Sequence, residues 1–210
     1  MRALFAVVAL AAALTAGAYS VAPHEPKPAP AIAVAKIMTK TGHGSGTNIG
    51  GGFLTTAAHV VGKEDEVTVR LSDGREVKGE VLWANTRYDL ALVRVAETPN
   101  FASANLACRS PVKGESVELA GNPLNMEFIS TWGRVAGAPL EIQSQWKSVV
   151  PVNGAVAGGM SGGAMFDDDG NLIGVIVGVS VMKVGPLSGG PVALGYVIGG
   201  DVVCKLMARA

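Results

Sequence analysis

Short segments in which apolar residues alternate with polar ones, or run together, recur along residues 33–198 and are separated by turns. In the first half of the chain these segments are 33–38, 46–50, 52–57, 66–71, 76–83 and 90–95. In the second half they are 116–121, 127–137, 147–153, 163–166, 172–181 and 191–198. Period-two and continuously apolar runs of this length are typical of strands, so the pattern predicts about six strands in each half.

The stretch 98–115 lacks this pattern and predicts a connection between the two halves. After residue 198 the sequence "GGDVVCKLMARA" predicts a helix, with Asp201 near its start and Arg209 near its end, where each opposes the helix dipole. Many strands and one helix indicate an all-β protein, either an antiparallel sandwich or a pair of barrels. The period alone does not distinguish these two architectures.

The composition agrees with an all-β fold and excludes one class of partner. The chain has 28 glycines among 210 residues, and only 16% of its residues are charged. Its 17 basic residues balance 17 acidic ones, and no basic stripe appears. Nucleic acid, which binds mainly through clustered positive charge, is therefore not expected as a partner.

The N-terminal 30 residues are expected to lie outside the folded domain. Residues 1–21 have a basic start at Arg2, an apolar run over 3–14 and small residues at Ala16 and Ala18, which predict a signal peptide cleaved near Ala18. The alternative is an uncleaved membrane anchor, because the apolar run approaches the ~20 residues of a spanning helix. Residues 22–30 contain four prolines and predict an extended linker. Both alternatives place the domain of residues 31–210 outside the cytoplasm, periplasmic or secreted.

Cys108 and Cys204 are the two cysteines of the chain. An exported protein can form a disulfide between them, closing a loop of about 97 residues that would stabilise the fold by about 4 to 5 kcal/mol. Two buried free thiols are the alternative. The two residues lack the spacing of a metal site, so no metal is expected.

Two histidines lie in the predicted domain. His43 is in "TGHGSG", which predicts a glycine-rich loop, and His59 follows a predicted strand in "LTTAAHVVG". Among the aspartates that follow, Asp65 and Asp73 lie in predicted turns. Asp89 directly precedes the apolar segment 90–95, where an acidic group needs a partner because an unpaired buried charge is costly.

Ser161 lies among glycines in "VAGGMSGGAMFDDDG", residues 156–170. Each glycine in a regular element costs roughly 0.5 to 1 kcal/mol relative to alanine, so the stretch is either a flexible turn or a backbone folded tightly around a nucleophile. A serine becomes nucleophilic when a histidine removes its proton and a carboxylate orients the histidine, and His59 and Asp89 supply these groups. The N–H groups of Gly159 and Ser161 could then stabilise the oxyanion.

Two other motifs lack the sequence context that their function requires. "GMSGG" matches the G-x-S-x-G nucleophile elbow of α/β-hydrolases, but that motif requires a helix after the serine and a histidine further along the chain. A predicted hairpin follows Ser161, and no histidine follows His59. Asp167, Asp168 and Asp169 resemble part of a calcium loop without its later glutamate, so they predict a hairpin tip.

"GSGTNIGGGFLTTAAHV", "YDLALVRV" and "GGMSGGAMFDDDGNLIGVIVG" together resemble the three signature segments of chymotrypsin-fold (trypsin-like) serine proteases, especially the bacterial Deg-type (high-temperature-requirement) group. The resemblance covers nearly all of residues 32–207. It implies two antiparallel six-stranded β-barrels, at about 31–107 and 108–199, a C-terminal helix at about 200–208, and a site between the barrels.

The resemblance also implies roles for single residues. His59 is the general base, Asp89 its orienting acid and Ser161 the nucleophile, and Gly159 with Ser161 supplies the oxyanion donors. The floor and wall of the specificity pocket would be formed by Ala155, Val177, Gly178 and Val179. Because that pocket holds no carboxylate, cleavage is expected after small or medium apolar residues.

Two departures from the family pattern change what is expected. Met160 stands where digestive members have an aspartate that pairs with a new N-terminus, so activation by N-terminal cleavage is not expected. Deg-type proteins usually continue into a peptide-binding PDZ domain, whereas this sequence ends at Ala210. The tail sensing and cage assembly of that group are therefore not expected here, and the sequence does not set an oligomeric state.

The sequence thus predicts an exported serine endopeptidase that acts on polypeptides through an acyl-enzyme, without metal or organic cofactor. Two alternatives stay open: a catalytically silent protease fold that serves as a binding module of the cell envelope, and an esterase that uses the same triad.

Overall fold

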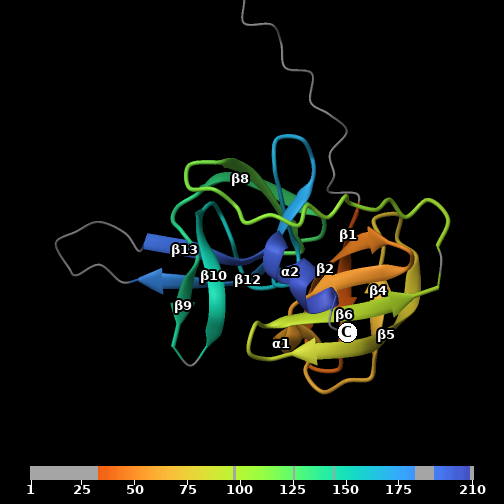
Figure 1. The fold of residues 1–210 in the computed structure, drawn as a ribbon. Coiled ribbons are helices and arrows are strands. Elements are labelled where there is room, and N and C mark those ends of the chain that lie inside the picture. Colours follow the sequence, from red (N-terminus) through yellow and green to blue (C-terminus); the bar gives the residue numbers. More distant parts are fainter. Residues whose placement is uncertain (1–32, 97, 125, 144, 183–191, 209–210) are drawn as a thin grey trace, which may run out of the picture.

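The computed structural model describes residues 33–96, 98–124, 126–143, 145–182 and 192–208, and within them it places thirteen β-strands and two short α-helices. The predicted signal or anchor segment 1–21 and the proline-rich linker 22–30 lie outside these described residues. The strands form two bodies that lie side by side in Figure 1, the first coloured orange to yellow-green and the second green to blue.

The first body is a closed barrel in which the strand order is β1-β2-β3-β6-β5-β4, with every neighbouring pair antiparallel. Its strands are β1 (Val34–Met38), β2 (His43–Gly50), β3 (Phe53–Thr56), β4 (Glu66–Arg70), β5 (Glu76–Asn85) and β6 (Leu90–Val95). The one-turn helix α1 (Ala58–Val61) follows β3 and was not expected from the pattern.

The second body is a sheet in the order β13-β12-β11-β7-β8-β10-β9, which closes because β13 also pairs with β10. Its elements are β7 (Ser116–Gly121), β8 (Ile129–Val135), β9 (Leu140–Ile142), β10 (Trp146–Asn153), β11 (Ala164–Phe166), β12 (Leu172–Met182) and β13 (Val192–Gly199). The all-β fold with two antiparallel barrels is thus confirmed. The short, exposed β9 is an additional strand outside the closed ring; its three residues are too few to show a period.

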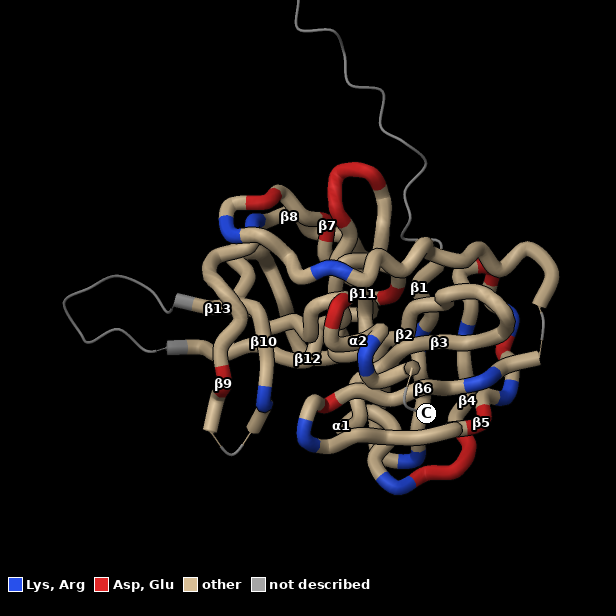
Figure 2. Tube along the Cα trace, in the orientation of Figure 1, with Lys and Arg blue, Asp and Glu red and all other residues tan. Residues whose placement is uncertain are grey.

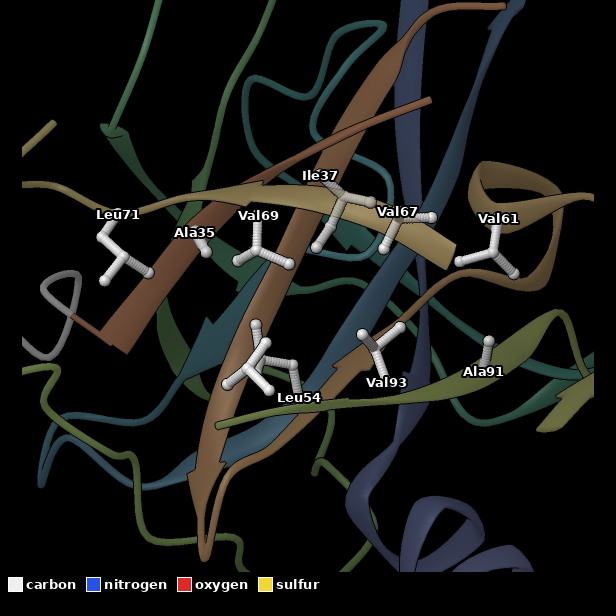
Figure 3. Close-up of a cluster of buried hydrophobic side chains, with 10 residues drawn as sticks. Ala35, Ile37, Leu54, Val61, Val67, Val69, Leu71, Ala91 and Val93 are labelled. Atoms are coloured by element: carbon white, nitrogen blue, oxygen red, sulfur yellow. The ribbon is translucent and has the colours of Figure 1, made fainter. Parts of the chain in front are cut away.

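Alternation along the strands fills the barrel interiors. In β4, Val67 and Val69 are buried while Thr68 and Arg70 are partly exposed. Figure 3 shows these two valines with Ile37, Leu54 and other apolar side chains of the first barrel meeting in one cluster. Full burial of a valine or leucine side chain contributes about 1.5 to 3 kcal/mol, so this cluster is a main source of the barrel's stability.

The stretch "TGHGSG" is not a loop: from His43 on, it forms the start of β2. The expectation was wrong because glycine here serves close packing rather than chain reversal. A Cβ on Gly44 would lie 2.5 Å from Cγ2 of Val60, and one on Gly46 would lie 3.0 Å from Cδ1 of Ile37. Glycine is therefore the residue that lets β2 run close to α1 and β1.

The C-terminal helix α2 (Gly200–Met207) is confirmed. It packs in an apolar cluster with residues of both barrels, among them Leu90 of β6 and Val175 of β12, and its Val203 is fully buried. Cys204 of this helix forms a disulfide with Cys108 of the segment that connects the barrels. The bond ties the end of the chain to the junction between the two halves.

Basic and acidic residues share the same parts of the trace in Figure 2 and do not separate into faces. A charge cluster that joins the barrels centres on Glu127, whose carboxylate accepts hydrogen bonds from Lys36 of β1 at 2.7 Å and Arg70 of β4 at 3.2 Å. The Lys36 hydrogen bond and both positive charges hold the pKa of Glu127 below its usual value, despite some desolvation. In the described part of the chain, no helix has the length and apolar character needed to cross a membrane.

Candidate active site

His59 and Asp89 are in direct contact in the first barrel. His59 lies on the single turn α1 after β3, and Asp89 lies in the turn between β5 and β6. The His59 Nδ1–H donates to Oδ2 of Asp89 at 2.7 Å, and the backbone N–H of His59 donates to Oδ1 at 2.9 Å. One carboxylate oxygen therefore fixes the imidazole ring, and the other fixes the backbone of the same residue. Nε2 of the ring stays available as a base.

The environment of Asp89 keeps it ionised. Its side chain is 9% exposed, and burial by itself would raise the pKa of the carboxyl group. The hydrogen bonds and charge of His59, together with a hydrogen bond from the indole of Trp146, outweigh burial and lower the pKa of Asp89 below its usual value. The imidazole of His59 is 51% exposed, so a substrate can reach it.

Ser161 follows a tight backbone turn at the start of the β11 hairpin. Its carbonyl oxygen accepts a hydrogen bond from the N–H of Ser45 in β2 at 2.7 Å, which connects the serine loop to the first barrel. Its hydroxyl lies 3.5 Å from the carbonyl oxygen of Val177, and among the described residues this is its one hydrogen bond. Ser161 lines the same cleft as His59 and Asp89, so the fold brings the three predicted residues together.

The backbone before Ser161 turns at Gly159 and leaves two N–H groups without a protein acceptor among the described residues. Gly159 has a φ of 96°, a conformation that favours glycine. The N–H of Met160 donates to the carbonyl of Ala157, but within the described residues the N–H groups of Gly159 and Ser161 donate to no protein acceptor. Two N–H groups without partners, on either side of a bonded one, are available to a substrate oxygen.

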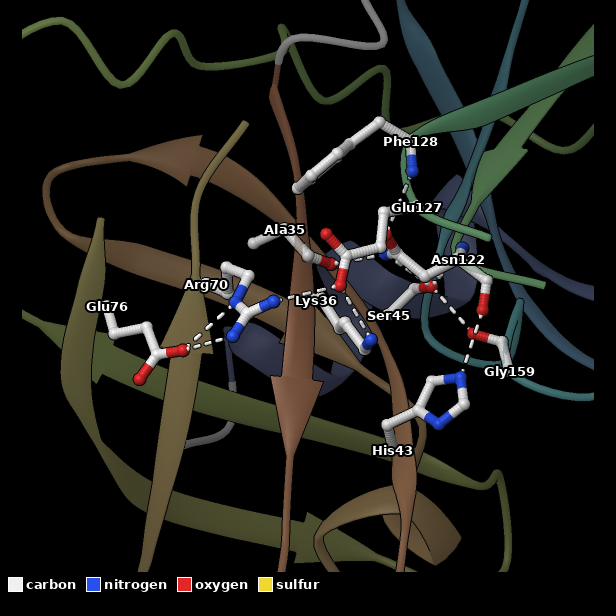
Figure 4. Close-up of polar contacts among 10 residues, drawn as sticks. All are labelled: Ala35, Lys36, His43, Ser45, Arg70, Glu76, Asn122, Glu127, Phe128 and Gly159. Carbon is white, nitrogen blue, oxygen red and sulfur yellow. Dashed lines mark hydrogen bonds and ion pairs between the residues drawn. The ribbon is translucent and has the colours of Figure 1, made fainter. Parts of the chain in front are cut away.

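A buried polar network holds the Gly159 carbonyl (Figure 4). The hydroxyl of Ser45 donates to this carbonyl at 2.8 Å and accepts the backbone N–H of Asn122 at 2.9 Å. Ser45 and Asn122 are both fully buried, and the Asn122 side chain also donates to the carbonyl of Ala35 at 3.0 Å. The Gly159 carbonyl belongs to the peptide bond that follows Gly159, so the network fixes the loop directly after the free Gly159 N–H.

His43 contacts this polar network and does not contact Asp89. Its Nε2–H donates to the carbonyl of Asn122 at 3.2 Å, and the ring lies so close to Gly159 that a Cβ there would be 2.7 Å from Nε2. The sequence identified neither Ser45 nor Asn122 as a site residue. Both are polar residues in apolar surroundings, a weak signal that becomes informative only when their partners are known.

The cleft beside the three predicted residues has a volume of about 670 Å³. Of the residues predicted for the specificity pocket, Val177, Gly178 and Val179 line this cleft; Ala155 lies outside its lining, and its carbonyl accepts a hydrogen bond from the Thr131 hydroxyl at 2.8 Å. The assignment of Ala155 to a pocket floor therefore stays a prediction.

Trp146 also lines the cleft, and sequence reasoning missed it. It is a single aromatic residue at the start of β10, and no local pattern marked it.

Two other sequence features have structural roles. Met160 is buried in the core of the second barrel. The aspartates 167–169 form the turn between β11 and β12, in which Asp167 accepts backbone N–H groups from Asp169 and Asn171 and pairs with Arg109. Within the described residues there is no cluster of three histidine, cysteine, aspartate or glutamate side chains that could bind a metal ion.

Comparisons with known proteins agree with this geometry. The sequence profile of the trypsin-like peptidase domain matches residues 44–175. The probable periplasmic serine endoprotease DegP-like of Halomonas elongata is 31% identical over 153 residues, which are 72% of this chain and 31% of the relative. The periplasmic serine endoprotease DegP of Escherichia coli is 27% identical over 161 residues, 75% of this chain and 33% of the relative.

A solved structure, the HtrA-type protease AlgW with a tripeptide, has a TM-score of 0.69 and 27% identity, over 85% of this chain and 60% of that one. The present chain spans about a third of the length of the curated relatives it matches.

Proposed function

Because this chain belongs to the trypsin-like peptidase family, we propose that it is an exported serine endopeptidase. The observation that carries the proposal is the 2.7 Å hydrogen bond between His59 Nδ1 and Asp89 Oδ2 in the cleft that Ser161 also lines. A histidine oriented in this way can remove a proton from a serine hydroxyl, which is the step that makes serine reactive at neutral pH.

In the proposed reaction the Ser161 oxygen attacks the carbonyl carbon of the scissile peptide bond, and Nε2 of His59 takes the hydroxyl proton. The carbonyl oxygen becomes an oxyanion, stabilised by the N–H groups of Gly159 and Ser161. His59 then gives its proton to the leaving amine, and an acyl-Ser161 ester remains. Water, deprotonated by His59, hydrolyses the ester and restores the serine. Asp89 stays ionised throughout and stabilises the imidazolium form.

The Ser161 hydroxyl contacts Val177 in the present structure, at the 3.5 Å limit of a hydrogen bond. Such a long contact holds the side chain weakly, so a rotation about its Cα–Cβ bond toward His59 is inexpensive. Catalytic hydrogen bonds are often long in the absence of substrate and shorten in the complex. The proposal therefore places the Ser161–His59 hydrogen bond in the substrate-bound state.

We also propose that the cleft accepts small or medium apolar side chains before the scissile bond. Val179 contributes apolar surface, and among the described residues that line the cleft the one carboxylate is that of Asp89, which is engaged by His59. A lysine or arginine side chain of the substrate would find no free acidic partner there. A panel of peptides that differ at this position tests the proposal, and a preference for arginine would contradict it.

Export is supported by two independent observations. The relatives described above are named as periplasmic proteases. The Cys108–Cys204 disulfide is of a kind that persists in oxidising compartments outside the cytoplasm. Fractionation of cells that produce the full chain, followed by detection in periplasm, medium and membrane, tests the location and shows whether the N-terminal segment is retained as an anchor.

The catalytic proposal is tested with the wild-type chain and Ser161→Ala. A fluorophosphonate probe should label the wild type and leave the variant unlabelled, because the probe reacts with an activated serine. Casein digestion by the same pair then distinguishes a peptidase from an esterase. Absence of labelling in a folded wild-type chain would refute the proposal and favour a silent binding module.

A further inference from the structure

Trp146 makes a contact within the candidate active site that the reaction described above does not use. Its indole N–H donates to Oδ2 of Asp89 at 3.0 Å. This is the same oxygen that accepts the Nδ1–H of His59 at 2.7 Å. Two donors therefore converge on one carboxylate oxygen, and one of them belongs to the second barrel.

The indole is held in place from several sides. Its ring centroid lies 5.5 Å from that of Tyr196 in β13, with the planes tilted by 38°. On another side the ring covers Gly178, where an added Cβ would lie 2.9 Å from Cη2 and 3.0 Å from Cζ2 of the indole. The next residue, Lys147, donates its backbone N–H to the carbonyl of Arg87 at 3.0 Å, which connects the start of β10 to the turn that carries Asp89.

Irregular strand pairing brings these groups together. The register of β10 against β9 shifts between Trp146 and Val149, and the register of β12 against β13 shifts between Ile176 and Gly178. Irregularities of this kind redirect side chains and are frequent next to active sites. Here they place the indole over a residue without a side chain and direct its N–H toward Asp89.

We propose that Trp146 is a positioning residue of the catalytic triad, which acts through Asp89 to orient His59. The inference rests on the proposed function, because it assigns Trp146 a role in the same reaction. An indole N–H donates and cannot accept, so this partner can never take up a proton or reverse the hydrogen bond. It holds Oδ2 in place while that oxygen also receives the His59 Nδ1–H.

The shared oxygen gives the proposal a consequence that a purely structural role would not have. With the indole bound, part of the charge on Oδ2 is engaged by Trp146. Without the indole, the charge on Oδ2 acts on His59 alone, so the pH dependence of catalysis should change together with kcat. Among the described residues that line the cleft, the charged or titratable groups are His59, Asp89 and Lys63, and the one that the Trp146 indole contacts is Asp89.

The central experiment compares Trp146→Phe with Trp132→Phe. The first variant keeps an aromatic ring against Tyr196 and Gly178 and removes the N–H. The second makes the same chemical change at a residue that is 74% exposed on β8. We expect kcat/KM of Trp146→Phe to fall about tenfold to a hundredfold, the range that corresponds to a hydrogen bond to a charged group. The fall should lie in kcat, with KM little changed, and the acid limb of the pH profile should move relative to that of the wild type.

Gly178→Ala tests the same Trp146–Asp89 hydrogen bond by moving the indole instead of removing its N–H. The new methyl group displaces the indole while the donor is retained, so the acid limb should move in the same direction as in Trp146→Phe. This variant keeps the proposal testable if Trp146→Phe fails to fold. If the pH profile of Gly178→Ala has the same acid limb as that of the wild type, the result would count against the proposal.

Indole N–H resonances supply a readout that does not depend on activity. The chain has three tryptophans, so the indole region of a nitrogen–proton spectrum holds three signals. In the Ser161→Ala chain the Trp146 signal should exchange slowly with solvent and should move when Asp89 is replaced by asparagine, whereas the Trp132 signal should not move. Fast exchange of the Trp146 signal, or no response to Asp89→Asn, would overturn the contact.

The two possible failures are distinguishable. If the folded wild-type chain does not react with the fluorophosphonate probe, the proposed function fails, and the role of Trp146 in catalysis fails with it. If the wild type is active and Trp146→Phe matches Trp132→Phe in kcat/KM and in its acid limb, the proposed function stands and the inference about Trp146 alone is refuted.

Discussion

Replacement of Gly159 by alanine is the sharpest test of the proposed oxyanion hole. A Cβ at this position would lie 2.3 Å from the carbonyl oxygen of Asn122 and 2.7 Å from Nε2 of His43, so the backbone has to move. An alanine also has to adopt a φ of 96°, and strained conformations of this kind cost on the order of 1 to 3 kcal/mol. A backbone rotation that relieves both the overlap of the Cβ and the strained φ would turn the Gly159 N–H out of the oxyanion hole.

Loss of one oxyanion donor typically lowers kcat by about a hundredfold to a thousandfold, or ~2.7 to 4 kcal/mol in the transition state. We therefore expect Gly159→Ala to reduce kcat by two to three orders of magnitude, with a much smaller change in KM, because the donor acts on charge that develops only in the transition state. Steady-state hydrolysis of a peptide substrate measures both constants, and urea unfolding shows whether the variant is folded.

Gly158→Ala is the matched control for this test. It makes the same change one residue earlier, at an exposed glycine where an added Cβ would have no neighbour within 4 Å. Its kcat should stay within about twofold of the wild type, as expected for a surface substitution without a specific contact. A kcat of folded Gly159→Ala close to that of Gly158→Ala would refute the assignment of the Gly159 N–H as an oxyanion donor.

Three further predictions concern stability and pH. Replacement of both Cys108 and Cys204 by alanine should lower the free energy of unfolding, measured in urea, by about 4 to 5 kcal/mol. The reason is that the disulfide joins residues 96 positions apart and so closes a long loop in the unfolded chain. A loss under about 1 kcal/mol would contradict this model. Ser45→Ala should lower the free energy of unfolding by about 1 to 3 kcal/mol, since the Gly159 carbonyl loses its donor and the buried Asn122 N–H loses its acceptor. It should also reduce kcat more than KM, and an unchanged kcat would show that the network does not position the loop. The folded-state pKa of Asp89 is lowered, so its ionised form stabilises the fold above its ordinary pKa of 3.8, and this contribution is lost as the pH falls through the lower folded value. Asp89→Asn should therefore destabilise the protein at pH 6 and have a smaller effect near pH 2, and equal destabilisation at both pH values would argue against the linkage.

Strand alternation could be predicted from the sequence because it is local. The positions of Val67 and Val69 follow from their spacing alone, and so does the existence of most strands. The start of β2 could not be predicted in this way, because Gly44 reads as part of a loop until its neighbour Val60 is known. A glycine required by close packing and a glycine required by a turn look the same in sequence.

The residues that support the site are harder to predict than those proposed to react. His59, Asp89 and Ser161 lie in distinctive local contexts, and the chemistry of serine catalysis requires their residue types. Trp146 and Asn122 act through partners 57 and 77 positions away along the chain, so no local pattern marks them. Their positions depend on the docking of the two barrels, which only the folded structure specifies.

The glycines around Ser161 show how closely the site depends on that docking. A Cβ on Gly162 would lie 2.0 Å from the carbonyl oxygen of Ser45, which belongs to the first barrel, and one on Gly163 would lie 2.2 Å from the carbonyl oxygen of Ala120, in the second barrel. The stretch is therefore a backbone packed tightly against both barrels and not a flexible turn. Because its hydrogen-bond partners come from both halves of the chain, separation of the barrels removes the support of the oxyanion loop even while each barrel keeps its own core. Activity should accordingly be lost at lower urea concentration than the strand signal in circular dichroism.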